Sequence, residues 1–202
     1  MMPAARESLL DAAFTALTRR PWSAVRMVDV AASAGVSRQT LYNEFGSKDG
    51  LARALVRREA DGYLAGVERA LAAHAGPHER LTATAEWTAS AARENALVRA
   101  MLTGCWSERL PAPVLSGVPS TSAVPAQRRA DGPLPSPGDL LRIVRDRAVT
   151  ALSAPGAAPA EVAELAFSCE LVARIALSCA AVPPGTGGMA GLIGGVLRGR
   201  QP

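Results

Sequence analysis

Residues 27–55 read MVDVAASAGVSRQTLYNEFGSKDGLARAL, and this stretch decides the fold of the N-terminal part of the chain. Its pattern predicts two short helices, Met27–Ala34 and Arg38–Phe45, joined by a turn that runs from Gly35 to Ser37. Gly35 can adopt the left-handed conformation that ends a helix, and Ser37 is a favourable N-cap for the next helix. Two short helices around such a turn, with an apolar residue at its centre, form a helix-turn-helix, whose second helix enters the major groove of DNA.

The second helix has an apolar face and an opposite polar face. At 100° per residue, Phe45 lies about 40° from Leu41, so both are expected to face the core. Gln39 and Asn43 fall about 160° from Leu41 and one helical turn apart, on the outer face. Their amides can pair with an adenine edge through two hydrogen bonds. The alternative is that the two amides are merely a solvated surface.

The residues around this face suit contacts with phosphate. Thr40 and Tyr42 flank the amide pair, although Tyr42 could instead be a half-buried packing residue. Arg38 stands at the start of the helix, where it could reach a guanine or a phosphate. Ser47 is a cap for the next helix, and Lys48, at that helix N-terminus, could clamp a phosphate.

This pattern resembles the TetR/AcrR family of bacterial transcriptional regulators over residues 6–58. The resemblance is carried by Asp29-Val30-Ala31, Gly35-Val36-Ser37, Thr40-Leu41-Tyr42, Phe45, Ser47-Lys48 and Leu51. It implies a homodimeric repressor that binds a palindromic operator and is released by a small-molecule effector bound in a helical body. It also implies phosphate contacts at Thr40, Tyr42 and Lys48, and base reading at Arg38, Gln39 and Asn43.

One departure from the family adds a candidate residue. Arg26 stands where the family usually has a threonine cap, and because an arginine cannot cap a helix, we expect Arg26 to contact phosphate. The candidate DNA-binding residues are therefore Arg26, Ser37, Arg38, Gln39, Thr40, Tyr42, Asn43 and Lys48.

The rest of the chain also shows helical periodicity and no convincing strand alternation, so we expect an all-α fold of about nine helices. We divide the chain into a DNA-binding domain at 1–55 and an effector-binding and dimerisation domain at 56–202. Proline-rich residues 111–137 predict an exposed loop, with disorder as an open alternative. The other expected helices are Arg6–Arg19, Lys48 to about His74, Pro77–Asn95, Ala96–Leu110, Gly138–Ser153, Pro159–Ala181 and Gly187–Arg200.

Composition and charge exclude several classes of protein. The net charge is +4, and residues 1–60 hold nine Lys or Arg against six Asp or Glu, which suits a polyanion-binding head. No signal peptide and no bilayer span is recognised, and three cysteines without CxxC pairing argue against a disulfide framework. We therefore expect a cytoplasmic, nucleoid-associated protein that contacts no membrane, with no metal or cofactor.

The body carries two sets of weaker candidates. An effector pocket, implied by the resemblance and expected to take an apolar or amphipathic molecule, could be lined by Trp87, Met101, Cys105, Trp106 and Phe167. An ordinary core is an equally good interpretation of each of these side chains.

The last two expected helices offer more apolar surface than the chain's own core requires, and two such helices from each of two subunits could form a four-helix interface. The candidate dimer residues are Leu171, Ile175, Leu192, Ile193 and Val196.

Three functions remain open at this point. The leading hypothesis is the ligand-responsive repressor, with activation in place of repression not distinguishable. The alternative is a helical ligand-binding or scaffold protein that has lost specific DNA binding, which the polar residues at 38–43 argue against. An enzyme comes third, because no nucleophile–base pairing or phosphate-binding loop is present in the sequence.

Overall fold

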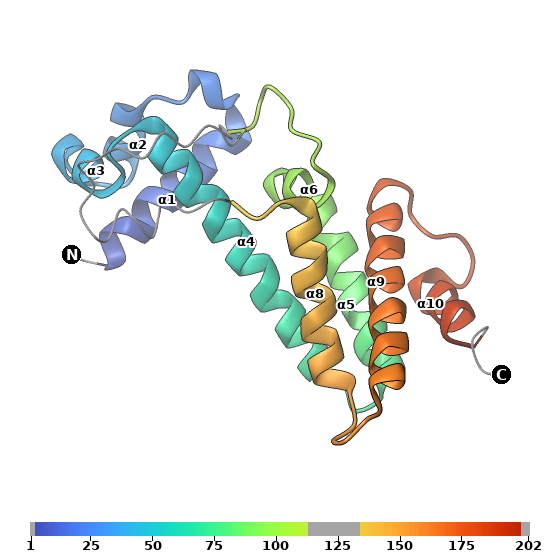
Figure 1. Cartoon of the computed structure of the whole chain (residues 1–202). Coiled ribbons are helices and arrows are strands. Elements are labelled where there is room, and N and C mark those ends of the chain that lie inside the picture. Colours follow the sequence, from blue (N-terminus) through green and yellow to red (C-terminus); the bar gives the residue numbers. More distant parts are fainter. Residues whose placement is uncertain (1–2, 113–133, 199–202) are drawn as a thin grey trace. The chain divides into compact units, whose positions relative to one another are not determined.

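The computed structural model describes residues 3–112 and 134–198, and within these ranges every regular element is helical (Figure 1). The all-α prediction is therefore confirmed. Nine α-helices and one short 3-10 helix lie in these ranges: α1 Pro3–Arg19, η1 Trp22–Ala24, α2 Met27–Ser33, α3 Arg38–Phe45, α4 Lys48–Ala72, α5 Pro77–Glu94, α6 Ala96–Thr103, α8 Pro137–Leu152, α9 Pro159–Ala181 and α10 Gly188–Arg198.

The described residues form two compact units, which we call the headpiece and the body. The headpiece contains residues 3–59 together with 106–112 and 134, and the body contains 60–105 and 135–198. Helix α4 contributes its first residues to the headpiece and the remainder to the body. Residues 106–112 join the headpiece although they follow a body helix, and the division into two domains at residue 55 stays a prediction.

In the headpiece, α1 packs on α2 and α2 packs on α3. Gly35 has a φ of +68°, the left-handed conformation that lets the chain leave α2. Ser37 then caps α3, because its Oγ accepts a hydrogen bond from the Thr40 N–H at 3.0 Å. The helix-turn-helix predicted from the sequence is thus formed, with the bounds of α3 as expected.

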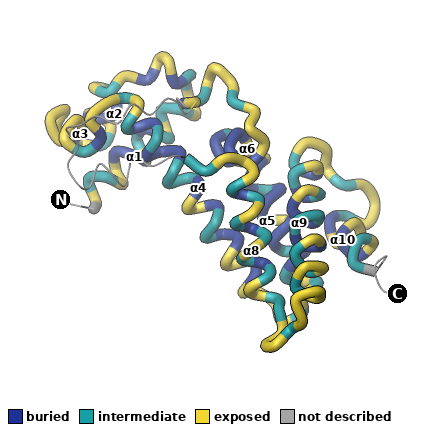
Figure 2. The backbone as a smooth tube through the Cα atoms, viewed as in Figure 1, coloured by how far each residue is buried: buried dark blue, intermediate teal, exposed yellow. Residues whose placement is uncertain are grey.

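In the body, α9 packs against both α5 and α8, and the three helices run side by side in Figure 1. Helix α6 packs on α5 and α8, while α10 covers α5 and α9. Small and aliphatic side chains fill the interior, among them Ala89, Ala92, Val172 and Ala176. The alanine-rich composition therefore allows close approach between helices, and Figure 2 shows buried residues along both α5 and α9.

The predicted helix Ala96–Leu110 is too long. Helix α6 ends at Thr103, and Gly104 follows in the left-handed conformation with a φ of +74°. A glycine in this position ends a helix by pairing the last carbonyls, here through the Gly104 N–H and the Ala100 carbonyl at 2.8 Å.

Two further predictions concern the proline-rich loop and the absence of a bilayer-spanning helix. The predicted loop at 111–137 lies almost entirely outside the described residues. None of the helices in 3–112 and 134–198 combines the length and the apolar character that crossing a bilayer requires.

Candidate nucleic-acid interface

Helix α3 presents one face to the headpiece core and the opposite face to solvent. Leu41 is fully buried and Phe45 is 7 % exposed, while Gln39 and Asn43 are exposed. The Gln39 Nε2 donates a hydrogen bond to the Asn43 Oδ1 at 2.8 Å. The two amides are therefore joined into one polar unit on the outer face, which the spacing of four residues allowed but did not specify.

The residues beside this amide pair are also exposed. Arg38 and Thr40 are exposed, and Tyr42 is 42 % exposed, so the ring of Tyr42 is not a packed core residue. The Ser37 and Thr40 hydroxyls lie 2.8 Å apart. The side chain of Ser37 therefore caps the N-terminus of α3, and Ser37 is itself exposed to solvent there.

Lys48 is held by the segment before α2. Its Nζ donates a hydrogen bond to the Ser23 carbonyl at 3.1 Å and lies 5.5 Å from the centre of the Trp22 ring. Partial burial lowers the pKa of Lys48, opposed by the neighbouring Asp49 carboxylate. Because a lysine has three donors, these contacts position the charge and still leave donor capacity for a phosphate.

Helix α4 begins as expected, because the Gly50 N–H donates to the Ser47 Oγ at 3.0 Å. Arg26 precedes α2 and makes no side-chain cap, which confirms that it cannot replace a threonine there. Its side chain is 76 % exposed, with Nε 3.7 Å from Asp29.

An ion pair that the sequence did not reveal holds α3 to α1. Arg6 Nη1 donates to the Glu44 Oε1 at 2.7 Å, and the Arg6 guanidinium lies 4.9 Å from the centre of the Phe45 ring. The pair explains why an acidic residue is tolerated on α3, because Glu44 faces α1 and not the outer face. A separation of 38 residues leaves no local signal from which the pair could be found.

A second long-range contact closes the headpiece. The Trp22 N–H donates to the Arg109 carbonyl at 2.8 Å, and Trp22 is 8 % exposed. Pro111, in the same segment as Arg109, is buried. The segment at 106–112 is therefore tied to the segment that also holds Lys48.

A family profile described as "Bacterial regulatory proteins, tetR family" matches residues 9–55, from the second turn of α1 into α4. Residues 9–55 are thus similar to the TetR family of bacterial regulatory proteins. The matched residues include the whole helix-turn-helix, so the likeness to these regulatory proteins covers α2, the turn and α3.

Two curated HTH-type regulators are similar to part of the chain. One is the HTH-type transcriptional regulator AlkX of Mycobacterium tuberculosis, 49 % identical over 71 residues, covering 35 % of this chain and 34 % of that protein. The other is the HTH-type transcriptional activator FasR of Mycolicibacterium smegmatis, 37 % identical over 81 residues, covering 40 % of this chain and 37 % of that protein. The chain thus matches little more than a third of the length of these two relatives.

The fold of the whole chain is matched by a solved structure of a TetR family repressor. This is AlkX from a Dietzia strain, implicated in the biodegradation of n-alkanes, with a TM-score of 0.50 at 24 % identity, covering 95 % of this chain and 92 % of that one. At this identity the likeness supports the TetR fold alone.

The body candidates for an effector pocket do not gather around one cavity. Trp87 is partly buried and donates its Nε1–H to the Tyr63 carbonyl at 3.0 Å, and Met101 is 3 % exposed in the core. Cys105 is exposed, Trp106 is grouped with the headpiece, and Phe167 is 58 % exposed on α9. None of the five lines the larger cavity of the body, which is formed by α4, α5 and α8.

The dimer candidates divide into two groups. Leu192 is 45 % exposed, and Leu171, Ile175 and Val196 are partly exposed, so all four can still contact a second subunit. Ile193 is fully buried within its own chain. A place for Ile193 in a subunit interface does not fit this burial, because its side chain is already covered by its own subunit.

Proposed function

We propose that this protein is a ligand-responsive transcriptional repressor that binds a palindromic operator as a homodimer. The observation that carries the proposal is the outer face of α3, where Gln39 and Asn43 are exposed and joined by a hydrogen bond. Such a face can enter the major groove while Leu41 and Phe45 hold the helix on its own core. The alternative of a scaffold that has lost DNA binding leaves this polar face without a role.

The paired amides are proposed to read bases as a unit. Because the Nε2 of Gln39 is engaged with Asn43, the Gln39 Oε1 and the Asn43 Nδ2 are the atoms turned to other partners. One acceptor and a neighbouring donor match the exocyclic amine and N7 of adenine. Thr40 and Tyr42 are exposed beside them and are proposed to bind phosphates, while the exposed Arg38 is proposed to read a base beside the amide pair.

Selection of bound sequences from random duplex DNA tests this proposal. The expected product is an inverted repeat, since each subunit would present one α3 to one half-site. Gln39→Ala and Asn43→Ala should each cost about 1–3 kcal/mol at that site and relax the preference at one or two base pairs. Thr18→Ala, an exposed substitution on α1, is the control. An unchanged preferred sequence in both amide variants contradicts the proposed base reading.

The homodimer is proposed to form through α9 and α10. Apolar side chains that remain exposed there include Phe167 and Leu192, at 58 % and 45 %. Leu192→Glu should place an unpaired carboxylate in the interface and shift the protein toward monomer. Ala190→Glu, on the opposite flank of α10, should not. Sedimentation decides the point, and a wild-type chain that is monomeric at micromolar concentration contradicts the dimer.

Repression rather than activation is the direction we propose, supported by the description of the Dietzia relative as a repressor. The FasR relative is described as an activator, so the direction needs its own test. A reporter gene placed behind the selected operator should be silenced by the wild-type chain, and a rise in its expression contradicts repression. We further propose that the protein acts in the cytoplasm, where its DNA target lies.

A further inference from the structure

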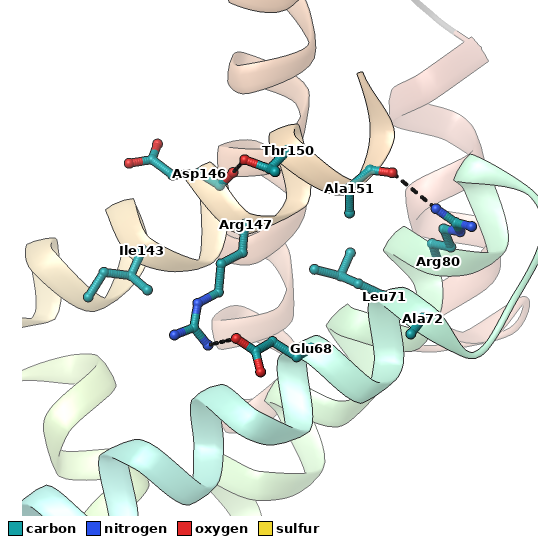
Figure 3. A pocket seen from close by; sticks show the side chains of 9 residues that line it. All are labelled: Glu68, Leu71, Ala72, Arg80, Ile143, Asp146, Arg147, Thr150 and Ala151. Atoms are coloured by element: carbon teal, nitrogen blue, oxygen red, sulfur yellow. Dashed lines mark hydrogen bonds and ion pairs between the residues drawn. The ribbon is translucent and has the colours of Figure 1, made fainter. Parts of the chain in front are cut away.

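The body contains an open groove of about 670 Å³ between the C-terminal half of α4, the start of α5 and the C-terminal half of α8 (Figure 3). This volume falls within the roughly 300–1,000 Å³ of small-molecule sites. Leu71, Ile143 and Ala151 supply apolar surface to its lining. The groove therefore offers an apolar molecule a place to bury its surface.

An arginine crosses the groove. Figure 3 shows Arg147 reaching from α8 to Glu68 on α4, and its Nη1 lies 3.0 Å from the Glu68 Oε1. The same nitrogen donates to the Leu64 carbonyl at 2.9 Å, which fixes the guanidinium in place. The Arg147 side chain is 34 % exposed, whereas the Glu68 side chain is 61 % exposed. The arginine is thus the anchored partner and the glutamate is the one that solvent or a ligand can displace.

The other acidic residue of the groove lining, Asp146, is paired with an arginine that does not line the groove. The Asp146 Oδ1 accepts hydrogen bonds from Arg145 at 2.9 and 2.8 Å, and Figure 3 shows the Asp146 carboxylate turned away from Arg147. This carboxylate therefore contributes little negative potential to the groove.

A second arginine stands at the far end. Arg80 donates to the Ala151 carbonyl at 3.0 Å and to the His74 carbonyl at 2.7 Å, so its charge is held in place by backbone dipoles and not by a carboxylate. Arg80 and Arg147 together face a single competing acid, Glu68. The groove is consequently electropositive around an apolar lining.

We propose that this groove binds an amphipathic organic anion, with its apolar part on Leu71 and Ile143 and its carboxylate in the place of Glu68 on Arg147. The assignment of this ligand as the effector rests on the proposed function, whereas its binding does not. A carboxylate on an arginine forms a charge-assisted, two-point contact, which a neutral or cationic head group cannot reproduce. The bound anion would also break the direct link between Arg147 and Glu68 that ties α8 to α4.

Titration calorimetry on the full chain with three matched probes tests the chemical class of the proposed ligand. Decanoate, decanol and decylammonium share one apolar chain and differ in head-group charge. Decanoate should bind with one molecule per chain and most tightly, decanol more weakly and decylammonium weakest. Equal binding of the three, tighter binding of decylammonium or no binding of decanoate overturns the proposal.

Two substitutions that should change the decanoate affinity in opposite directions test whether the anion binds at Arg147. Glu68→Gln removes the competing acid and should tighten decanoate on the order of threefold, the size of a partly exposed ion pair. Arg147→Gln should weaken it by at least as much. Arg174→Gln, whose side chain pairs with Glu170 on α9, is the control and should change nothing. A misfolded variant cannot bind more tightly, so tighter binding by Glu68→Gln supports the assignment. Weaker binding by a Glu68→Gln protein that keeps the wild-type Tm overturns it.

Operator binding is measured separately, without decanoate and then with it. A protein that binds its operator without decanoate satisfies the DNA-binding part of the proposed function, whatever the groove binds. Release of the operator by decanoate supports the effector role. Binding of decanoate with no effect on the operator overturns the effector role and leaves the anion site standing.

Discussion

Two glycines on α4, Gly62 and Gly66, are expected to respond in opposite ways to the same substitution. Both lie inside the helix, where replacing glycine by alanine stabilises the folded state by about 1 kcal/mol. A Cβ added to Gly62 would meet no heavy atom within 4 Å, so nothing offsets this gain. A Cβ added to Gly66 would overlap the ring of Trp87.

The cost at Gly66 follows from how Trp87 is held. The indole is partly buried, and its Nε1–H donates to the Tyr63 carbonyl at 3.0 Å. Forcing the ring away strains the packing by about 1–3 kcal/mol and costs about 1 kcal/mol for the hydrogen bond. Less the helical gain of about 1 kcal/mol, Gly66→Ala should destabilise the protein by about 1–3 kcal/mol.

Thermal unfolding at one fixed protein concentration measures both variants. For a chain of 202 residues, each 1 kcal/mol corresponds to about 2–4 °C in Tm, so Gly62→Ala should raise the Tm by about that amount. Gly66→Ala should lower it by about 4–8 °C for a central loss of about 2 kcal/mol, and should shift the Trp fluorescence of the folded protein. Equal shifts in the two variants would refute the close approach of α4 to Trp87.

Three further outcomes test the headpiece and the thiols. Lys48→Ala should weaken binding to all DNA sequences and reduce the salt slope by about one unit, so an unaltered slope excludes a phosphate contact. Arg6→Ala and Glu44→Ala should show a coupling of about 1 kcal/mol in the free energy of unfolding, whereas simple additivity argues against their 2.7 Å ion pair. Of the three cysteines, Cys105 alone is exposed and should react rapidly with a disulfide reagent at pH 8; burial raises the pKa of Cys169 to about 11, which keeps that thiol protonated. Rapid reaction of all three cysteines in the folded protein would contradict this burial.

Local signals in the sequence predicted the elements that local chemistry determines. The bounds of α3 and α9 agree with the expected Arg38–Phe45 and Pro159–Ala181, because a serine cap and a proline at the first position mark their starts. The inward face of α3 also follows from periodicity alone, since Leu41 and Phe45 are buried as expected. The outward amides follow as the complement of that face.

The remaining features depend on neighbours that are distant in sequence. Periodicity groups Leu192 and Ile193 on one apolar helix but does not say what covers each, and Ile193 is covered by its own subunit. Lys48 was expected at a helix N-terminus, but its contact with Ser23, 25 residues earlier, has no signature in either segment. Likewise, the groove at Arg147 and Glu68 joins α8 to α4, and neither residue stands in a recognisable motif.

The hydrogen bond from Trp22 to Arg109 has a practical consequence for taking the protein apart. A gene fragment cut after Glu59 would encode the full helix-turn-helix yet omit the segment whose carbonyl accepts a hydrogen bond from the Trp22 N–H. The excised piece would leave this N–H to water, so it should be less stable than the same residues in the intact protein. A fusion of this headpiece to another ligand-binding domain would therefore have to include two separate segments, 1–59 and 106–112.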